Sequence, residues 1–303
     1  MAYSLRKLRL AIIKKMQFLP IKLYLESYYE YYVGKKLDLD NPIEFNQKLQ
    51  WLKAYYRVPL LTQLVDKYEV RKYVEETVGP QYLNELIKVY NKASDVNFDE
   101  LPEQFVIKAV HGYHFNLIVE DKKKLNRLKS KLLMTKWMSK NQYTRGGLEW
   151  AYKNVTPKLI AEKYLTEMGK ASINDYKFFF FNGEPKFIQV DLDRTTGHLR
   201  SYYDLDWNKI DGLTTIGIKE YKGALEKPKN YDEMVSVATK LANKFPFVRV
   251  DLYNINGTIL FGEMTFYPTD GRMDFAPEVY NTTFGDYMTL PAIPKGKKYI
   301  TSI

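Results

Sequence analysis

The stretch FPFVRVDLYNINGTILFGEMTFYPTDG, residues 245–271, decides how the rest of the chain is organised. Hydrophobic and polar side chains alternate over residues 248–253 and again over 260–265, which is the period of a β-strand. Asn256-Gly257 lies between the two runs, and this dipeptide favours a tight turn because both residues tolerate positive φ. The sequence therefore predicts a β-hairpin.

The length of the hairpin loop determines which side chains share a face of the sheet. A two-residue loop would put Asp251 and Glu263 on opposite faces. A three-residue loop over residues 255–257, with a glycine bulge, pairs 249 with 263, so that Arg249, Asp251, Glu263 and Thr265 share one face. We predict the second arrangement, because two acids, a cation and a hydroxyl suit a divalent metal and phosphate oxygens. A solvated strand pair with a salt bridge explains the pattern equally well.

The composition limits the kinds of site that the chain can build. Its 303 residues are 45% hydrophobic, enough for a large core and for two or more domains. The absence of cysteine excludes disulfides and thiolate chemistry, and three scattered histidines do not form a zinc pattern. A formal charge of +10 favours anionic partners, but no nucleic-acid-binding motif is present. Without a signal peptide or an apolar run of about 20 residues, we expect a cytoplasmic protein.

The N-terminal part reads as mostly helical. Residues 1–24 carry six basic side chains and no acid, and Leu8, Ile12 and Met16 recur at near-helical spacing. Such a helix either contacts anionic lipid at the inner face of a membrane or packs on its own domain. Asn41 followed by Pro42 predicts a further helix start. We expect a helical region over residues 1–80, a subdomain over 81–165 and a C-terminal domain over 166–303.

Three segments in the middle of the chain read as strands: FVIKAV (105–110), KLIAEKYL (158–165) and DYKFFFFNGEPKFIQVDLDR (175–194), the last turning at Asn182-Gly183. Lys108 stands alone among apolar residues in the first of them. A lysine in such a strand either protects a sheet edge or directs its ammonium at a bound anion. The loop HGYHFN, residues 111–116, follows directly.

Taken in order, these segments resemble the TupA-like ATP-grasp proteins of bacterial polysaccharide and teichuronopeptide biosynthesis. The resemblance runs from about Leu49 to about Leu290 and includes VDKYEVRKYVEE (65–76) and the hairpin quoted first. It implies an α+β ATP-grasp fold, in which two antiparallel subdomains hold ATP between them, here with a mostly helical N-terminal region.

The resemblance also implies ATP and Mg²⁺ as cofactors and gives roles to individual residues. Lys67 and Lys108 match lysines that approach the nucleotide phosphates, and Asp175 matches the acid that binds the ribose. The loop over the phosphates includes Gly112 and Asn116, or else its side chains His111 and His114 take over that contact. The segment whose backbone reads the adenine edge corresponds to Glu162, Lys163, Tyr164 and Leu165.

The hairpin supplies the rest of the implied site. Asp251 and Glu263 match the magnesium ligands, and Arg249 matches the arginine that neutralises the transferring phosphoryl group, so that Arg249 and Lys108 are the candidate catalytic residues. Thr265 stands where most ATP-grasp enzymes have asparagine as a further metal ligand, and either its hydroxyl or a water would serve in that place.

The function implied by the resemblance is that of a carboxylate–amine ligase, which forms an amide through an acyl phosphate in capsule, exopolysaccharide or teichuronopeptide biosynthesis. Arg194 and Arg272 are candidates for holding the substrate carboxylate, although a structural salt bridge explains either equally well. A metal-dependent glycosyltransferase of surface polysaccharide synthesis is the main alternative, since D-x-D patterns occur at residues 38–40, 191–193 and 204–206. A nucleotide-binding scaffold at the membrane is the third.

Overall fold

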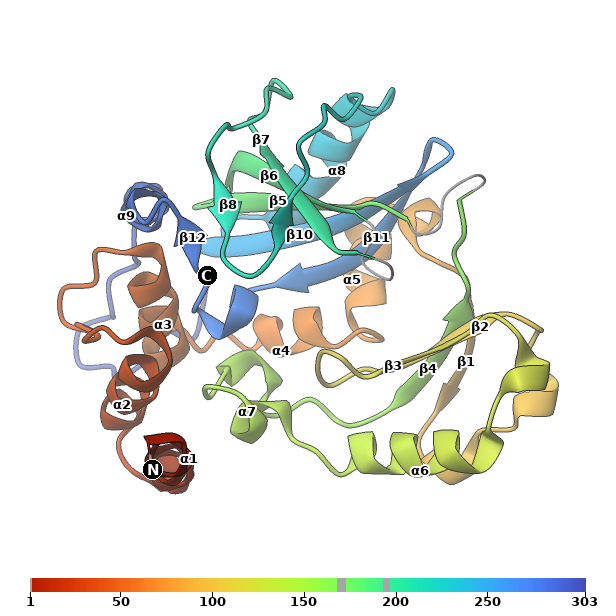
Figure 1. Cartoon of the computed structure of the whole chain (residues 1–303), viewed down its shortest axis with the longest axis horizontal. Coiled ribbons are helices and arrows are strands. Elements are labelled where there is room, and N and C mark those ends of the chain that lie inside the picture. Colours follow the sequence, from red (N-terminus) through yellow and green to blue (C-terminus); the bar gives the residue numbers. More distant parts are fainter. Residues whose placement is uncertain (1, 168–172, 193–196) are drawn as a thin grey trace.

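The computed structural model of the chain describes residues 2–167, 173–192 and 197–303. Two β-sheets form separate halves of the molecule, and the N-terminal helices pack at one side of the larger half (Figure 1). This is the α+β arrangement that the sequence predicts. The proposed domain boundaries at residues 80 and 165 stay a prediction.

The smaller half, which we call the lid, is a four-stranded antiparallel sheet in the order β1-β4-β2-β3. Its strands are β1 (Leu86–Tyr90), β2 (Phe105–Ala109), β3 (Asn116–Val119) and β4 (Leu159–Lys163). Helix α6 (Arg127–Met138) covers one face of this sheet, where Met134 and Trp137 join the core of the lid. The short helix α7 (Gln142–Arg145) follows it. The predicted strand FVIKAV is confirmed, while β1 was not predicted.

The larger half is a six-stranded sheet in the order β11-β10-β5-β6-β7-β9. It contains β5 (Asp175–Phe181), β6 (Glu184–Leu192), β7 (Leu199–Tyr203), β9 (Lys219–Glu220), β10 (Phe247–Ile255) and β11 (Thr258–Thr265). All neighbours pair antiparallel except the short edge pair β7–β9. A separate two-stranded ribbon joins β8 (Thr214–Thr215) to β12 (Phe275–Ala276).

Helices cover both faces of the larger sheet, as the four consecutive phenylalanines of β5 predict. On one face lies α8 (Tyr231–Ala242), which buries Met234 and Leu241. On the other face, Phe45 of α3 (Phe45–Tyr55) packs against Phe181 and Phe247, while α9 (Val279–Asp286) closes the same end. Every residue of β5 is buried. The helices on the second face cover only its aromatic end, and the polar end remains for the site described below.

The N-terminal region contains α1 (Ala2–Lys15), α2 (Ile21–Val33), α3, α4 (Leu60–Val65) and α5 (Val70–Thr77). The predicted helix start at Asn41 is wrong. Glu44 is the N-cap of α3, and its side chain and that of Gln47 form a reciprocal capping box. The backbone amide of Asn41 instead donates to Asp38 Oδ1 at 3.0 Å, which holds this segment in a turn before the helix.

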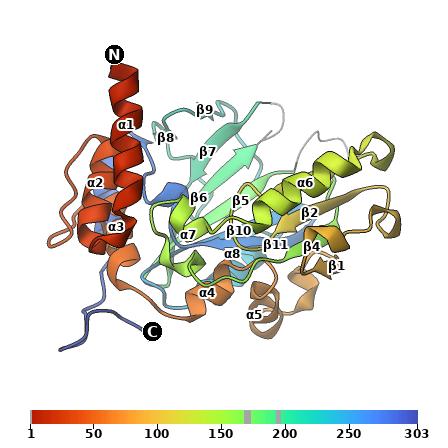
Figure 2. The same cartoon turned by 90° about the horizontal axis from the view of Figure 1, so that it is seen from below.

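Helix α1 extends beyond the neighbouring helices toward the N-terminus (Figure 2). Ile13 is buried against α2, whereas Leu8 and Ile12 are 58% and 54% exposed beside the exposed Lys14 and Lys15. None of the helices in the described parts of the chain is long and apolar enough to cross a membrane.

We therefore expect weak binding of the protein to anionic vesicles, because exposed apolar and basic side chains alternate along one helix. The binding should decrease with added salt. Vesicle flotation of the full chain and of a chain without residues 1–24 measures this, and equal flotation of the two would show that α1 only packs on its own domain.

Candidate active site

The central hairpin places the predicted side chains on one face, but with a different loop length and register from those predicted. Its loop has two residues, not three: Ile255 pairs with Thr258, and Asn256 and Gly257 have φ of 51° and 84°. The register then shifts between Leu252 and Asp251, which leaves Gly262 as the extra residue of a β-bulge in β11.

Because of this bulge, Asp251 lies directly opposite Glu263, and Arg249 opposite Thr265. The predicted pairing of 249 with 263 is therefore wrong by two residues, because 249 pairs with 265. The prediction that the four side chains share one face agrees with the structure, because residues paired across a ladder point to the same side of the sheet.

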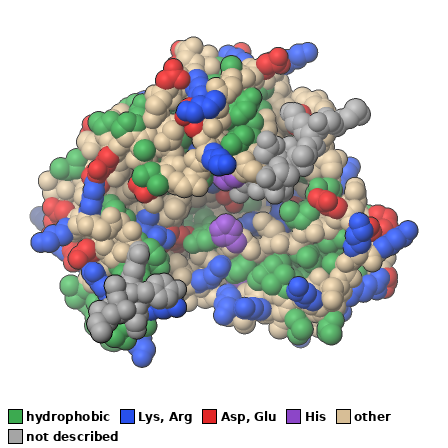
Figure 3. Space-filling view, viewed as in Figure 1, with side chains coloured by type: hydrophobic (Ala, Val, Ile, Leu, Met, Phe, Trp, Pro, Cys, Tyr) green, Lys and Arg blue, Asp and Glu red, His purple; other side chains and the backbone are tan. Residues whose placement is uncertain are grey.

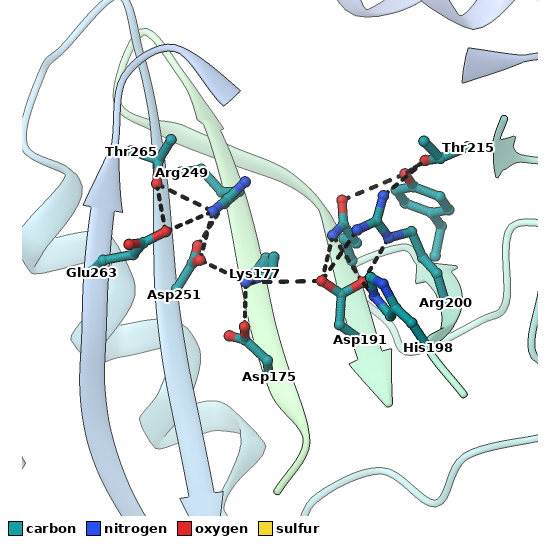
Figure 4. Close-up of polar contacts among 12 residues, drawn as sticks. Asp175, Lys177, Asp191, His198, Arg200, Thr215, Arg249, Asp251, Glu263 and Thr265 are labelled. Atoms are coloured by element: carbon teal, nitrogen blue, oxygen red, sulfur yellow. Dashed lines mark hydrogen bonds and ion pairs between the residues drawn. The ribbon is translucent and has the colours of Figure 1, made fainter. Parts of the chain in front are cut away.

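The four side chains form one hydrogen-bonded cluster (Figure 4). Arg249 donates from Nε to Asp251 Oδ1 and from Nη2 to Asp251 Oδ2, both at 2.6 Å. The same Nη2 lies 3.1 Å from both Glu263 Oε1 and Thr265 Oγ1. Asp251 is only 2% exposed, whereas the Glu263 side chain is 39% exposed. The guanidinium therefore bridges a buried acid and an acid that borders open space.

The cations around Glu263 come from the larger sheet and from the N-terminal region. Desolvation raises the pKa of this carboxyl, but Lys67, Arg249 and Lys177 outweigh that effect and lower it to about 2. Burial lowers the pKa of Lys67, and Glu263 acts against this shift. Glu263 is thus ionised at neutral pH, and Lys67 of the turn before α5 lies close enough to interact with it.

The lid contributes a second lysine to the same region. Lys108 of β2 is 27% exposed, and its Nζ donates to Glu162 Oε2 at 2.7 Å. Glu162 also accepts from Arg71 at 3.2 Å. Lys67 donates to the carbonyl oxygen of Gly112 at 2.6 Å, which ties it to the loop at the end of β2. The surface is hollowed between the two halves, and Lys and Arg side chains gather around the recess (Figure 3).

A sequence model of one protein family, described as TupA-like ATPgrasp, matches residues 47–289. The chain belongs to the TupA-like ATP-grasp family. Its two antiparallel subdomains are those of the ATP-grasp fold.

Solved structures of similar fold accompany this match. D-alanine–D-alanine ligase from Bacillus anthracis is 17% identical, with a TM-score of 0.41 over 73% of this chain and 64% of the ligase chain. ATP-grasp ligase PsnB, complexed with minimal precursor, Mg and ADP, is 12% identical, with a TM-score of 0.37 over 84% and 64%. Cdc123 from Schizosaccharomyces pombe is 10% identical, with a TM-score of 0.42 over 77% and 94%. The chain spans less than two thirds of either ligase. A search of curated proteins found no match.

The donor set of the TupA-like ATP-grasp hairpin fits magnesium. Two carboxylates from adjacent strands offer hard oxygens, and Thr265 Oγ1 donates to Glu263 Oε1 at 3.1 Å, so the hydroxyl lies beside them. Among the described residues, no group of three or more His, Cys, Asp or Glu side chains is placed to hold a metal. Two carboxylates are nevertheless sufficient where nucleotide phosphates complete the coordination.

Part of the predicted adenine-binding segment already uses its backbone groups in hydrogen bonds of the lid. The Lys163 amide donates to Glu85 O at 3.0 Å, and the Lys163 carbonyl accepts from Asn84 at 2.9 Å. Glu162 uses its side chain to hold Lys108. The backbone groups of Tyr164 and Leu165, just beyond β4, therefore remain the better candidates for contact with a base. The assignment itself stays a prediction.

The loop between β2 and β3 places its two histidines differently. His111 is 2% exposed, with Nε2 3.0 Å from the Trp137 carbonyl, so it is buried against α6 in the lid. Burial lowers its pKa, which keeps it neutral. His114 is exposed, with φ of 62°. Asn116 begins β3 opposite Lys108 and is also exposed. His111 is thus buried while His114 is exposed, and which groups of this loop contact phosphate stays a prediction.

Of the two candidate substrate arginines, the structure describes only Arg272, which takes no part in the cluster. The Arg272 guanidinium lies 4.1 Å over the ring of Tyr32, and its Nε is 3.3 Å from Asp270 Oδ2, which is the structural salt bridge named as its alternative role. Arg194 lies outside the described residues.

Three polar residues extend the cluster across the sheet, of which the sequence analysis named only Asp191, in a D-x-D pattern. Lys177 of β5, only 4% exposed, donates to Asp251 Oδ2 at 2.7 Å and contacts Asp175. Asp191 of β6 lies 3.9 Å from the same ammonium, and Arg200 of β7 pairs with Asp191. The predicted ribose acid Asp175 is therefore engaged by Lys177, and its role toward a ribose stays a prediction. A lysine among buried phenylalanines was the available signal for Lys177.

Proposed function

We propose that the protein is a Mg-ATP-dependent carboxylate–amine ligase that acts in bacterial surface-polysaccharide or teichuronopeptide biosynthesis. The observation that carries the proposal is the position of Lys67, which interacts electrostatically with Glu263 of the central hairpin and with Lys108 and Glu162 of the lid. Cations beside two carboxylates at a common recess are what a metal-bound nucleotide phosphate requires.

Each side chain has a part in holding the reacting groups. Lys67 and Lys108 would pair with phosphate oxygens, and the Glu162 carboxylate keeps the Lys108 ammonium extended from its strand. Arg249 would neutralise the phosphoryl group in transfer. Asp251, Glu263 and Thr265 would hold Mg²⁺, which supplies charge neutralisation at the phosphates when bound. The carboxylate of the substrate is ionised at pH 7, so it needs no base before it attacks.

The D-x-D patterns of the glycosyltransferase alternative lie apart from the central hairpin or take part in local contacts. Asp38 and Asp204 accept backbone amides in local turns. Asp191 pairs with Arg200.

The reaction is tested with isotope-labelled substrate. We expect that UDP-glucuronate or one of the common amino acids, with ¹⁸O in its carboxylate, passes label to inorganic phosphate when ATP, Mg²⁺ and an amine are present. The reason is that the carboxylate oxygen bridges carbon and phosphorus in an acyl phosphate and leaves with phosphorus. Mass spectrometry of the released phosphate measures this.

Other outcomes identify the alternatives. A stable phosphorylated product without phosphate release would make the enzyme a kinase. Release of UDP from a sugar nucleotide without ATP would favour the glycosyltransferase. If the protein binds ATP but turns over neither UDP-glucuronate nor any of the amino acids, the nucleotide-binding scaffold would remain as the function.

A further inference from the structure

A row of polar side chains crosses the larger sheet on the face that carries the candidate metal ligands. Asp251 pairs with Lys177, and Lys177 with Gln189. One step along the strands, Asp175 pairs with Asp191, and Asp191 with Arg200. The row ends at His198, which lies beside Asp191 on the side away from Asp251 (Figure 4). The proposed function uses only the first part of this row.

Asp191 is a fixed buried anion. It is 1% exposed, and its oxygens accept from Arg200 at 2.6 and 3.2 Å and from Gln189 Nε2 at 3.1 Å. Burial raises the pKa of this carboxyl, but His198 and Arg200 outweigh that effect and hold it well below its usual range. Asp191 therefore stays ionised while its position is set by two neighbours.

His198 is the group that faces this anion from the open side. Its Nε2 lies 3.2 Å from Asp191 Oδ1, and its side chain is 32% exposed. With a proton on Nε2, the ring would turn that proton toward the carboxylate and carry its lone pair on Nδ1. A histidine beside a buried carboxylate, with no partner for Nδ1 among the described residues, has the arrangement of a general base.

The proposed reaction needs such a base in its second half. An amine with an ordinary pKa is mostly an ammonium ion at pH 7, and it has no lone pair until it loses a proton. The neighbouring acids already face cations, because Asp175 and Asp251 contact Lys177 and Asp251 also pairs with Arg249. Lys177 connects the two ends of the row: it contacts Asp251, the partner of Arg249, and lies 3.9 Å from Asp191, the partner of His198 (Figure 4).

We propose that His198 is the catalytic base that accepts the proton of the amine substrate, with Asp191 as its positioning residue; this rests on the proposed ligase function. The amine nitrogen forms a bond to the acyl carbon, and the bond from that carbon to the phosphate oxygen breaks. Phosphate leaves with the bonding electron pair. The proton lost from nitrogen goes to His198 Nδ1 and then to solvent.

The test compares two nucleophiles in wild type and in His198→Gln. Hydroxylamine is largely uncharged at neutral pH, so it traps an acyl phosphate as a hydroxamate without a base. With the amino acids as amines, we expect His198→Gln to lower the rate of amide formation by about 100-fold, the lower end of the range for general base catalysis. The rate of hydroxamate formation should stay within about threefold, because formation of the acyl phosphate does not use this proton transfer.

A matched control is Glu184→Gln on β6, the strand of Asp191, since the Glu184 side chain is 72% exposed and pairs with Lys186 in a local contact. It should change neither rate. Hydroxamate formation by His198→Gln also shows that the variant is folded.

Each outcome has one meaning. No hydroxamate from the wild type would refute the ligase function, whatever His198 does. Normal hydroxamate with unchanged amide formation in His198→Gln would overturn the role of His198. An equal fall in both rates would also overturn it, because His198 would then act on ATP or on the carboxylate.

Discussion

Asp251→Asn and Glu263→Gln should each lower the rate of ATP-dependent phosphate release by about 100-fold or more, if these acids hold the metal of phosphoryl transfer. Both changes are nearly isosteric, but each removes a negative oxygen from the ion. The positive charges of Lys67, Arg249 and Lys177 would then be balanced by one carboxylate fewer. Binding of a divalent cation therefore becomes less favourable.

The measurement uses the carboxylate and amine that release labelled phosphate in the wild type, at saturating Mg-ATP. Electron paramagnetic resonance of Mn²⁺ with ADP gives a second readout, in which both variants should bind the ion more weakly. Glu184→Gln again serves as the control with an unchanged rate. Near-normal turnover in both variants, with unchanged Mn²⁺ binding, would remove Asp251 and Glu263 from the metal site.

Lys53→Met should reduce the free energy of unfolding by about 3–5 kcal/mol, which is typical when one partner of a buried ion pair is lost. Lys53 is fully buried, and its Nζ lies 2.5 Å from Asp270 Oδ1. It also donates to the Asp270 carbonyl at 2.9 Å and to Gln50 Oε1 at 3.0 Å. The cations beside Asp270 are Lys53 and Arg272. Burial and the nearby Asp270 raise the pKa of the neighbouring acid Glu149.

Urea unfolding followed by circular dichroism measures this effect. Lys136→Met on the exposed side of α6 is the matched control and should stay within about 0.5 kcal/mol of the wild type. Adding Asp270→Asn to Lys53→Met should restore part of the stability, because it removes the buried charge that the first change leaves unpaired. A double variant that is less stable than Lys53→Met would show that packing, and not the ion pair, explains the loss.

Much of the fold was predictable because its signals are local. The alternation of hydrophobic and polar residues predicted the strands of the central hairpin. Asn182-Gly183 predicted the turn between β5 and β6, and these two residues have left-handed φ of 50° and 84°. Strand β1 and the true cap at Glu44 were missed, since LIKVY is short and the cap depends on a side chain three residues later.

The site was predictable in its residue types but not in its full extent. The acids and Arg249 lie in one continuous segment, whereas Lys177, Asp191 and His198 come together only through the order of strands in the sheet. Two local signals for the correct hairpin were also present: Asn-Gly favours a two-residue turn, and an isolated glycine in a strand, Gly262, indicates a bulge.

The bulge at Gly262 has a consequence for how the hairpin folds. If the two-residue turn paired its strands without interruption, Glu263 would lie opposite Val250, on the face that packs against α8. That mispaired hairpin would save about one backbone hydrogen bond, worth roughly 0.5–1.5 kcal/mol. It would bury an unpaired carboxylate, which costs several kcal/mol. The charge of Glu263 therefore selects the bulged pairing during folding, so the acid proposed to hold the metal also corrects the register of the sheet on which it stands.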